Sequence, residues 1–185
     1  MLFHFRLYAS DINSAIFFEE RVNQDYSSQT VLKLYVSKEY KEDFTLWGFI
    51  WLHDQVPFRE NSDTQSQYIE FVDIFLGISW NLWDYFEPYL FYDKYYNRSI
   101  DYSSSYFAIG FDSILFHQSK HKLHYYFELY SEPKNGNMDY FGGESGLEYS
   151  YEIYKHTSLY CLPVWNQDQT HTNIYSFRYG IKVDF

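Results

Sequence analysis

Hydrophobic and polar residues alternate one by one along much of the chain. The clearest case is the segment 175–185, where aromatic or aliphatic side chains occupy one set of alternate positions and small or charged ones the other. A period of two places these sets on opposite faces of a β-strand, whereas a helix would mix them on one surface. The segment therefore predicts a strand with one apolar face.

The same alternation recurs upstream and predicts about eleven strands and no helix, in a single domain covering 1–185. The expected strands are 3–8, 16–22, 32–36, 44–53, 72–80, 86–96, 106–116, 123–130, 147–154, 158–165 and 175–185. Short connections are expected around 10–13, 38–43, 81–84, 117–120 and 155–157, and longer ones around 24–29, 54–67, 97–104, 131–144 and 166–172. Because every second connection is a long one, an up-and-down antiparallel β-barrel would carry all the long ones on one rim.

Composition also favours an all-β fold. Aromatic residues make up 24% of the chain, and Tyr and Phe suit a pleated surface. No apolar run approaches the roughly eighteen residues of a transmembrane helix. The tryptophans lie near predicted strand ends, as in the interfacial girdles of membrane barrels, at Trp47, Trp51, Trp80, Trp83 and Trp165. A soluble barrel or sandwich would alternate in the same way with its apolar face inside, so the alternation alone leaves both open.

The chain ends with Tyr-Gly-Ile-Lys-Val-Asp-Phe, which resembles the C-terminal assembly signal of bacterial outer-membrane β-barrel proteins, the porin-like family. In that family the last strand ends in an aromatic residue preceded by alternate hydrophobic residues. Tyr179, Ile181, Val183 and Phe185 occupy these positions. The resemblance implies a transmembrane barrel in the bacterial outer membrane, surrounded by lipid and lipopolysaccharide and inserted by the barrel-insertion machinery. It also implies that the apolar faces meet lipid.

Single-chain bacterial barrels have an even number of strands with both termini in the periplasm. Counting back from a periplasmic Phe185 leaves the segment 3–8 without a partner strand. We therefore expect ten strands or twelve, with ten favoured, and twelve would mean that an N-terminal strand is missing. His4 and Arg6 interrupt any apolar signal sequence, so we expect a mature or recombinant form, or a fragment.

With lipid outside, the polar faces line the lumen. Its basic residues come from the first and last strands, which become neighbours on closure, and are Arg6, Lys33, Arg178 and Lys182. Its acidic residues come from the middle strands and are Asp73, Glu87, Asp93, Asp112, Glu128, Glu148 and Glu152. This predicts a basic wall facing an acidic wall, with a transverse field that favours polar or zwitterionic solutes. The alternative is a closed barrel whose charges form a buried, paired network. Inward tyrosines would either fill volume or stack on sugars, and are Tyr8, Tyr35, Tyr89, Tyr106, Tyr126, Tyr130 and Tyr154.

The leading functional hypothesis is an outer-membrane channel for small polar solutes. The second is a closed barrel whose connections 54–67 and 131–144 bind a partner or surface ligand. The third is a barrel hydrolase, for which His156 with Ser158 and His53 with Asp54 are the candidates.

Other chemistry is disfavoured. The net charge of -11 argues against nucleic-acid binding, because phosphates would be repelled. Cys161 is alone, so no cysteine metal cluster forms. His117, His121 and His124 span a predicted turn and strand start, where they fall on different faces. We therefore expect no metal site and no cofactor.

Overall fold

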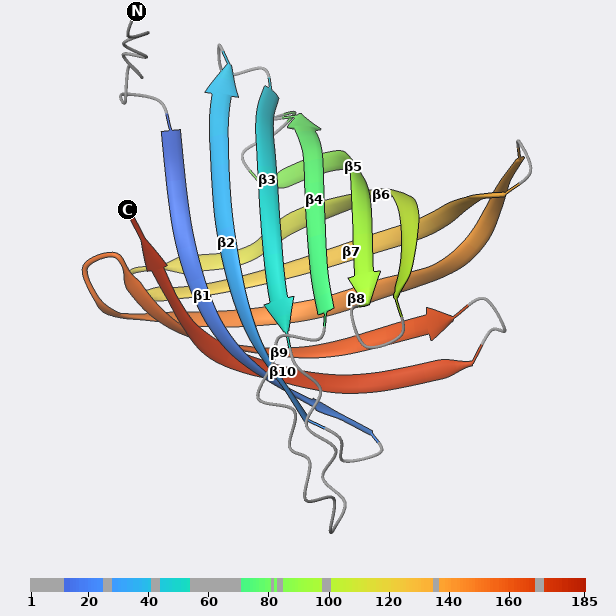
Figure 1. Cartoon of the computed structure of the whole chain (residues 1–185). Helices are drawn as coiled ribbons and strands as arrows, with labels where there is room; N and C mark the ends of the chain where they lie inside the picture. Colours follow the sequence, from blue (N-terminus) through green and yellow to red (C-terminus); the bar gives the residue numbers. More distant parts are fainter. Residues whose placement is uncertain are drawn as a thin grey trace, which may run out of the picture.

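Ten antiparallel strands close into one barrel in the computed structural model, counting the residues that it describes (Figure 1). They are β1 (Ile12–Asn23), β2 (Ser28–Tyr40), β3 (Phe44–His53), β4 (Phe71–Trp80), β5 (Phe86–Asn97), β6 (Tyr102–Gln118), β7 (His121–Lys134), β8 (Asn137–Tyr154), β9 (Thr157–Asp168) and β10 (Asn173–Asp184). Each strand pairs with its neighbours in sequence, and β10 closes the barrel on β1, with Phe18 opposite Ile181. The expected all-β, up-and-down topology is confirmed, with ten strands.

The structure describes residues 12–24, 28–40, 44–53, 71–80, 82, 85–97, 101–134, 137–168 and 172–185, without the side chains of 102, 134, 137–141 and 168. The expected strand 3–8, with Arg6 and Tyr8, lies outside these residues. So do Trp83 and the connection 54–67. Within the described residues, no helix is long and apolar enough to span a bilayer.

The alternate connections fall on opposite rims. The turn rim carries the connections after β2, β4, β6 and β8 together with Phe185, and the loop rim carries those after β1, β3, β5, β7 and β9. The short connections expected around 117–120 and 155–157 are present, as two-residue turns at 119–120 and 155–156. The expected long connection 131–144 is wrong, because β7 and β8 continue through most of it as a hairpin, with Ser131 opposite Tyr140 (Figure 1). A hairpin that extends past the barrel needs no apolar face, so its polar, glycine-containing sequence resembles a loop.

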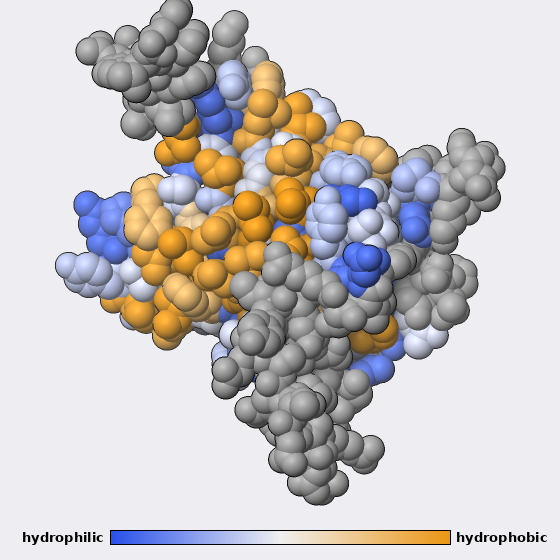
Figure 2. Space-filling view, in the orientation of Figure 1, coloured by the Kyte–Doolittle hydropathy of each residue, from blue (hydrophilic) through white to orange (hydrophobic). Residues whose placement is uncertain are grey.

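The outer face is apolar and exposed. Ile109 is 63% exposed, Leu76 62% and Phe18 58%, although all three lie in the middle of strands. Figure 2 shows such side chains gathered in a band across the middle of the barrel. Patches of this kind are rare on soluble monomers and indicate a surface that contacts lipid or protein. Tyr179 and Ile181 of the terminal signal lie on this face of β10, and Phe185, one residue past the end of the strand, is also exposed.

Small, charged and aromatic residues occupy the inner face, and several are deeply buried. Ala15, Val31 and Ala108 are almost wholly inaccessible, and Glu19 is 2% exposed. The interior is therefore packed with side chains in this part of the lumen. We name the buried trio Glu19, Lys33 and Tyr160, from β1, β2 and β9, the inner layer.

The expected girdle of tryptophans at the membrane interface is wrong for two of them. Trp47 and Trp51 lie on the inner face of β3, where Trp47 packs on Phe91 with ring centroids 5.6 Å apart. β3 is apolar on both faces, since Leu46 and Ile50 are exposed outside. Alternation therefore gave no signal for which β3 residues point inward.

Gly180 lets β10 pack closely against β1 where the barrel closes. A Cβ at this position would lie 2.1 Å from the carbonyl oxygen of Phe18 on β1. A backbone atom cannot move aside as a flexible side chain does, so Gly180→Ala must push β10 away from β1. We expect a loss of about 1–3 kcal/mol in the free energy of unfolding, measured by urea titration in vesicles.

Gly48→Ala is the matched control for this variant. Its Cβ would meet its nearest neighbour, the Phe75 carbonyl oxygen, at 3.3 Å, which a slight adjustment relieves. Equal unfolding midpoints for the two variants would contradict the steric explanation.

Candidate functional site

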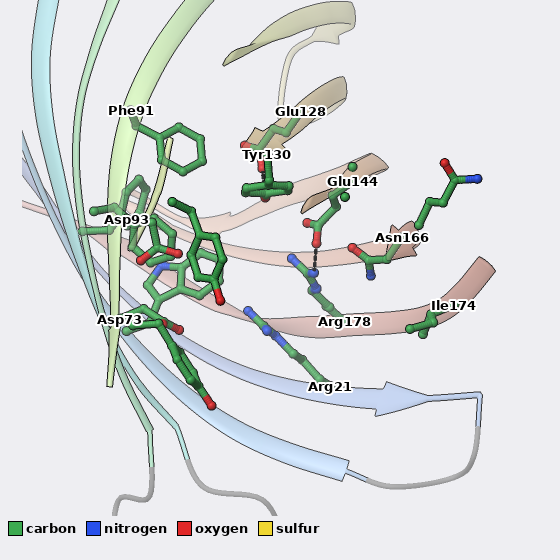
Figure 3. Close-up of a pocket in the computed structure, with 18 of the residues that line it drawn as sticks. Arg21, Asp73, Phe91, Asp93, Glu128, Tyr130, Glu144, Asn166, Ile174 and Arg178 are labelled. Carbon is green, nitrogen blue, oxygen red and sulfur yellow. Dashed lines mark hydrogen bonds and ion pairs between the residues drawn. The ribbon is translucent and has the colours of Figure 1, made fainter. Parts of the chain in front are cut away.

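A cavity of about 390 Å³ lies inside the barrel next to the loop rim. Arg21, Trp51 and Asp73, which line it, are each two residues from the end of a strand at that rim. Its lining combines aromatic rings with charged groups, and Figure 3 shows both projecting into it. This volume and this mixture are typical of sites for small molecules.

One wall of the cavity is aromatic. It is formed by Trp47, Phe49 and Trp51 on β3, Phe75 on β4 and Phe91 on β5. The rings pack on one another edge-on or tilted, with Trp51 and Phe75 only 4.5 Å apart between centroids. Mutual packing of this kind holds the rings in fixed positions. The wall is therefore a rigid apolar surface within a lumen that otherwise carries charges.

Two arginines lie on the side formed by β1 and β10 (Figure 3). Arg21 Nε donates to Glu19 Oε1 at 2.8 Å, and its guanidinium lies 4.8 Å from the Trp51 ring centroid. Arg178 Nη2 donates to Glu144 Oε2 at 2.7 Å. Arg21 Nη2 and Arg178 Nε are buried and have no hydrogen-bond partner in the described part of the chain. Each arginine is thus anchored by one nitrogen and retains an unused donor.

Two aspartates lie on the opposite side, on β4 and β5 (Figure 3). Asp73 Oδ2 lies 3.0 Å from Nε2 of His53, whose ring stacks on Phe71. Asp93 is 7% exposed, and its Oδ1 has no hydrogen-bond partner among the residues described. A buried carboxylate oxygen without a donor is costly, so it indicates that something else supplies one.

Glutamates and tyrosines continue the polar lining between these two sides. Tyr89 and Tyr130 both donate to Glu128, the former at 2.7 Å. Tyr126 donates to Glu144, which also holds Arg178. These three tyrosines therefore hold the carboxylates of Glu128 and Glu144 in position.

Deeper in the barrel, Glu19 is the centre of the inner layer. Its carboxylate accepts from Lys33 Nζ at 2.5 Å and from the Tyr160 hydroxyl at 2.9 Å, in addition to Arg21. The Lys33 ammonium also lies 4.6 Å from the Trp51 ring centroid. All charged groups in this layer are paired, as burial requires.

Apart from Arg6, which lies outside the described residues, every predicted charged residue of the lumen lies at an inward position of its strand. Tyr154, which was also expected to point inward, is 76% exposed at the end of β8. Lys33, Asp73, Asp93, Glu128 and Arg178 cluster at or beside the cavity. The others lie nearer the turn rim, namely Glu87, Asp112, Glu148, Glu152 and Lys182. The predicted basic residues that the structure describes lie on β2 and β10 and the predicted acidic ones on β4 to β8, but the carboxylate of Glu19 on β1 lies among the basic groups, so charge is not fully segregated between the two sides.

Sequence reasoning missed three elements of this site. It did not include Glu19 and Arg21 among the predicted lumen residues, although their alternate spacing puts both on one face of β1. It left out Glu144 because that residue fell in an expected loop. It placed the Trp47 and Trp51 rings outside. The spacing of Glu19 and Arg21 was the only available signal for any of these.

The other candidates for chemistry are not brought together. His156 lies in a turn with φ 65° and is exposed, with Ser158 at the start of β9. His53 pairs with Asp73, while Asp54 is not described. His124 contacts Asp112 at 2.9 Å and His121 packs on the Tyr151 ring. No group of three potential metal ligands occurs among the residues that the structure describes.

No protein-family model and no curated protein sequence matches the chain. Solved structures do match it. The KdgM porin has a TM-score of 0.55 at 11% identity, covering 92% of this chain and 99% of its own. The translocator domain of the autotransporter NalP from Neisseria meningitidis has 0.51 at 9% identity, covering 97% and 90%. The NanC porin has 0.50 at 11% identity, covering 93% and 98%.

The fold is that of the outer-membrane β-barrels. Two features of the described residues agree with this fold: an even number of strands, and an apolar outer face on the last of them, β10. At these identities the likeness concerns the fold, and the lining of the lumen is this chain's own.

Proposed function

We propose that this chain is an outer-membrane channel for small polar solutes. The observation that carries the proposal is a charged cavity inside a closed barrel whose outer face is apolar. Membrane location is supported by the fold and by the exposed side chains in the middle of the strands. A polar solute that enters from the loop rim would meet the cavity first.

The inner layer is the proposed constriction of this channel. It lies beside the cavity, and its polar side chains are paired in one network around Glu19. A narrow, charged passage admits small polar solutes and rejects large or apolar ones. Two solved structures with this fold are described as porins, one of them in complex with disordered oligogalacturonate.

Ion selectivity tests the proposal. Four carboxylates line the cavity against two guanidinium groups, so the channel should prefer cations. We expect Asp93→Asn to shift the reversal potential in a salt gradient toward anion selectivity, because it removes one of the acidic groups that line the cavity. Lys33→Met and Arg178→Gln each remove a positive charge, so they should shift the reversal potential toward cation selectivity. Planar-bilayer recordings measure this directly.

Glu20→Gln is the control for these recordings. Glu20 is adjacent to Glu19 but lies on the outer face, where it accepts a hydrogen bond from Thr30. Its reversal potential should equal that of the unmodified protein. Channels that conduct but do not respond to Asp93→Asn would contradict a path through the cavity.

A closed barrel is the second candidate, and the burial of Glu19, Lys33 and Arg178 favours it. The β7–β8 hairpin would then present a binding surface at the loop rim (Figure 1). Correctly folded protein that gives no conductance steps in bilayers would favour this candidate over the channel.

A further inference from the structure

The cavity contains unused hydrogen-bonding groups of opposite charge on opposite sides. On the β5 side, Asp93 is buried and lacks a donor for Oδ1. On the β1 and β10 side, Arg21 Nη2 and Arg178 Nε lack acceptors among the described residues. In Figure 3 the carboxylate of Asp93 and the two guanidinium groups extend toward the same space from opposite walls. Orphaned groups at both ends of one cavity indicate a ligand that satisfies both.

The chemistry of each end defines the ligand. An ammonium group would donate to Asp93 Oδ1. Two aromatic residues of the cavity lining lie next to Asp93, since Phe75 is opposite it on β4 and Phe91 is two residues away on β5, and aromatic rings attract cations. A carboxylate would accept from Arg21 and Arg178, which present planar, permanently charged donors. Between the two ends, the aromatic wall suits a short apolar segment.

We propose that the cavity binds a small zwitterion whose ammonium and carboxylate ends are several bonds apart, such as a dipeptide or an ω-amino acid. That such a zwitterion is a transported solute rests on the proposed channel. Its binding in the cavity does not require conduction. The separation of the charges follows from topology, since β5 lies across the barrel from the junction of β1 and β10. In an α-amino acid the ammonium and carboxylate groups are attached to the same carbon, so it would reach only one end of the cavity.

Binding can be measured on the folded protein in detergent micelles by calorimetry and by quenching of tryptophan fluorescence, since Trp47 and Trp51 line the cavity. The probes are Ala-Phe dipeptide, its C-terminal amide, which lacks the anion, and its N-acetyl form, which lacks the cation. We expect the dipeptide to bind about tenfold or more tightly than either, because each blocked form loses one charge-assisted contact.

Asp93→Asn should weaken dipeptide binding about tenfold and leave binding of the N-acetyl form unchanged. Asp112→Asn is the matched control, because Asp112 is inward but pairs with His124 outside the cavity. The probe series needs no variant, so it remains informative if Asp93→Asn misfolds. Equal affinity for all three probes, or equal effects of the two variants, would overturn the zwitterion site. Binding without conductance would overturn only the channel, and conductance without binding only the site.

Discussion

Glu19→Ala is expected to destabilise the barrel by about 3–5 kcal/mol, the range for breaking a buried ion pair from one side. Glu19 is 2% exposed and accepts hydrogen bonds from Lys33, Arg21 and Tyr160. Without it, the Lys33 ammonium stays buried beside another cation and has no carboxylate partner. Urea unfolding in lipid vesicles, followed by tryptophan fluorescence, measures the loss.

Two further variants show whether the unpaired charge is the cause. Glu20→Ala removes the neighbouring glutamate from the outer face and should change stability by no more than about 0.5 kcal/mol. Lys33→Met in the Glu19→Ala background removes the stranded cation and should restore much of the lost stability. If Glu19→Ala cost no more than Glu20→Ala, the inner layer would not stabilise the fold.

Ile109→Arg should cost about 2–4 kcal/mol of stability in a bilayer, the range for arginine at its midplane. Ile109 is 63% exposed in the middle of β6, flanked by Leu90 and Leu129 on the neighbouring strands. Lipid at this position would have to accommodate a charge, whereas water would accept it freely. The measurement is urea unfolding of protein refolded into phosphatidylcholine vesicles.

Ser103→Arg provides the matched comparison. Ser103 lies on the same strand and the same face, at the loop rim, where the cost should fall to about 0–1 kcal/mol. A depth-dependent difference is the signature of a surrounding bilayer. Equal and small effects at both positions would mean that water, and not lipid, surrounds the barrel.

Where one face of a strand was polar, the sequence predicted the fold well. β10 alternates cleanly, and both its strand character and its apolar outer face follow from 175–185. β3 is apolar on both faces, so its inward tryptophans could not be told from outward ones. Glu144 was missed because strand pairing between β7 and β8 continues through a segment with loop-like composition. Alternation in a sequence reveals a strand only where its two faces differ in polarity, and in these segments the two faces differ little.

The sequence was enough to predict that several charged residues point into the barrel, but not which of their side chains pair with one another. The placement of Lys33 and Arg178 near one another follows from β10 closing on β1. The pairing of Arg178 with Glu144 and of Lys33 with Glu19 depends on side-chain reach and register, which no local pattern encodes. The unused atoms of Asp93, Arg21 and Arg178 become visible only once these pairings are known.

We propose that small polar solutes cross a membrane through this barrel. Osmotic swelling of vesicles that contain the refolded protein tests it most directly. We predict that they swell in isotonic glycine and do not swell in an isotonic trisaccharide, while protein-free vesicles swell in neither on the same timescale. A barrel shown to be folded by its β-sheet circular dichroism, in vesicles that fail to swell in glycine, would contradict the account.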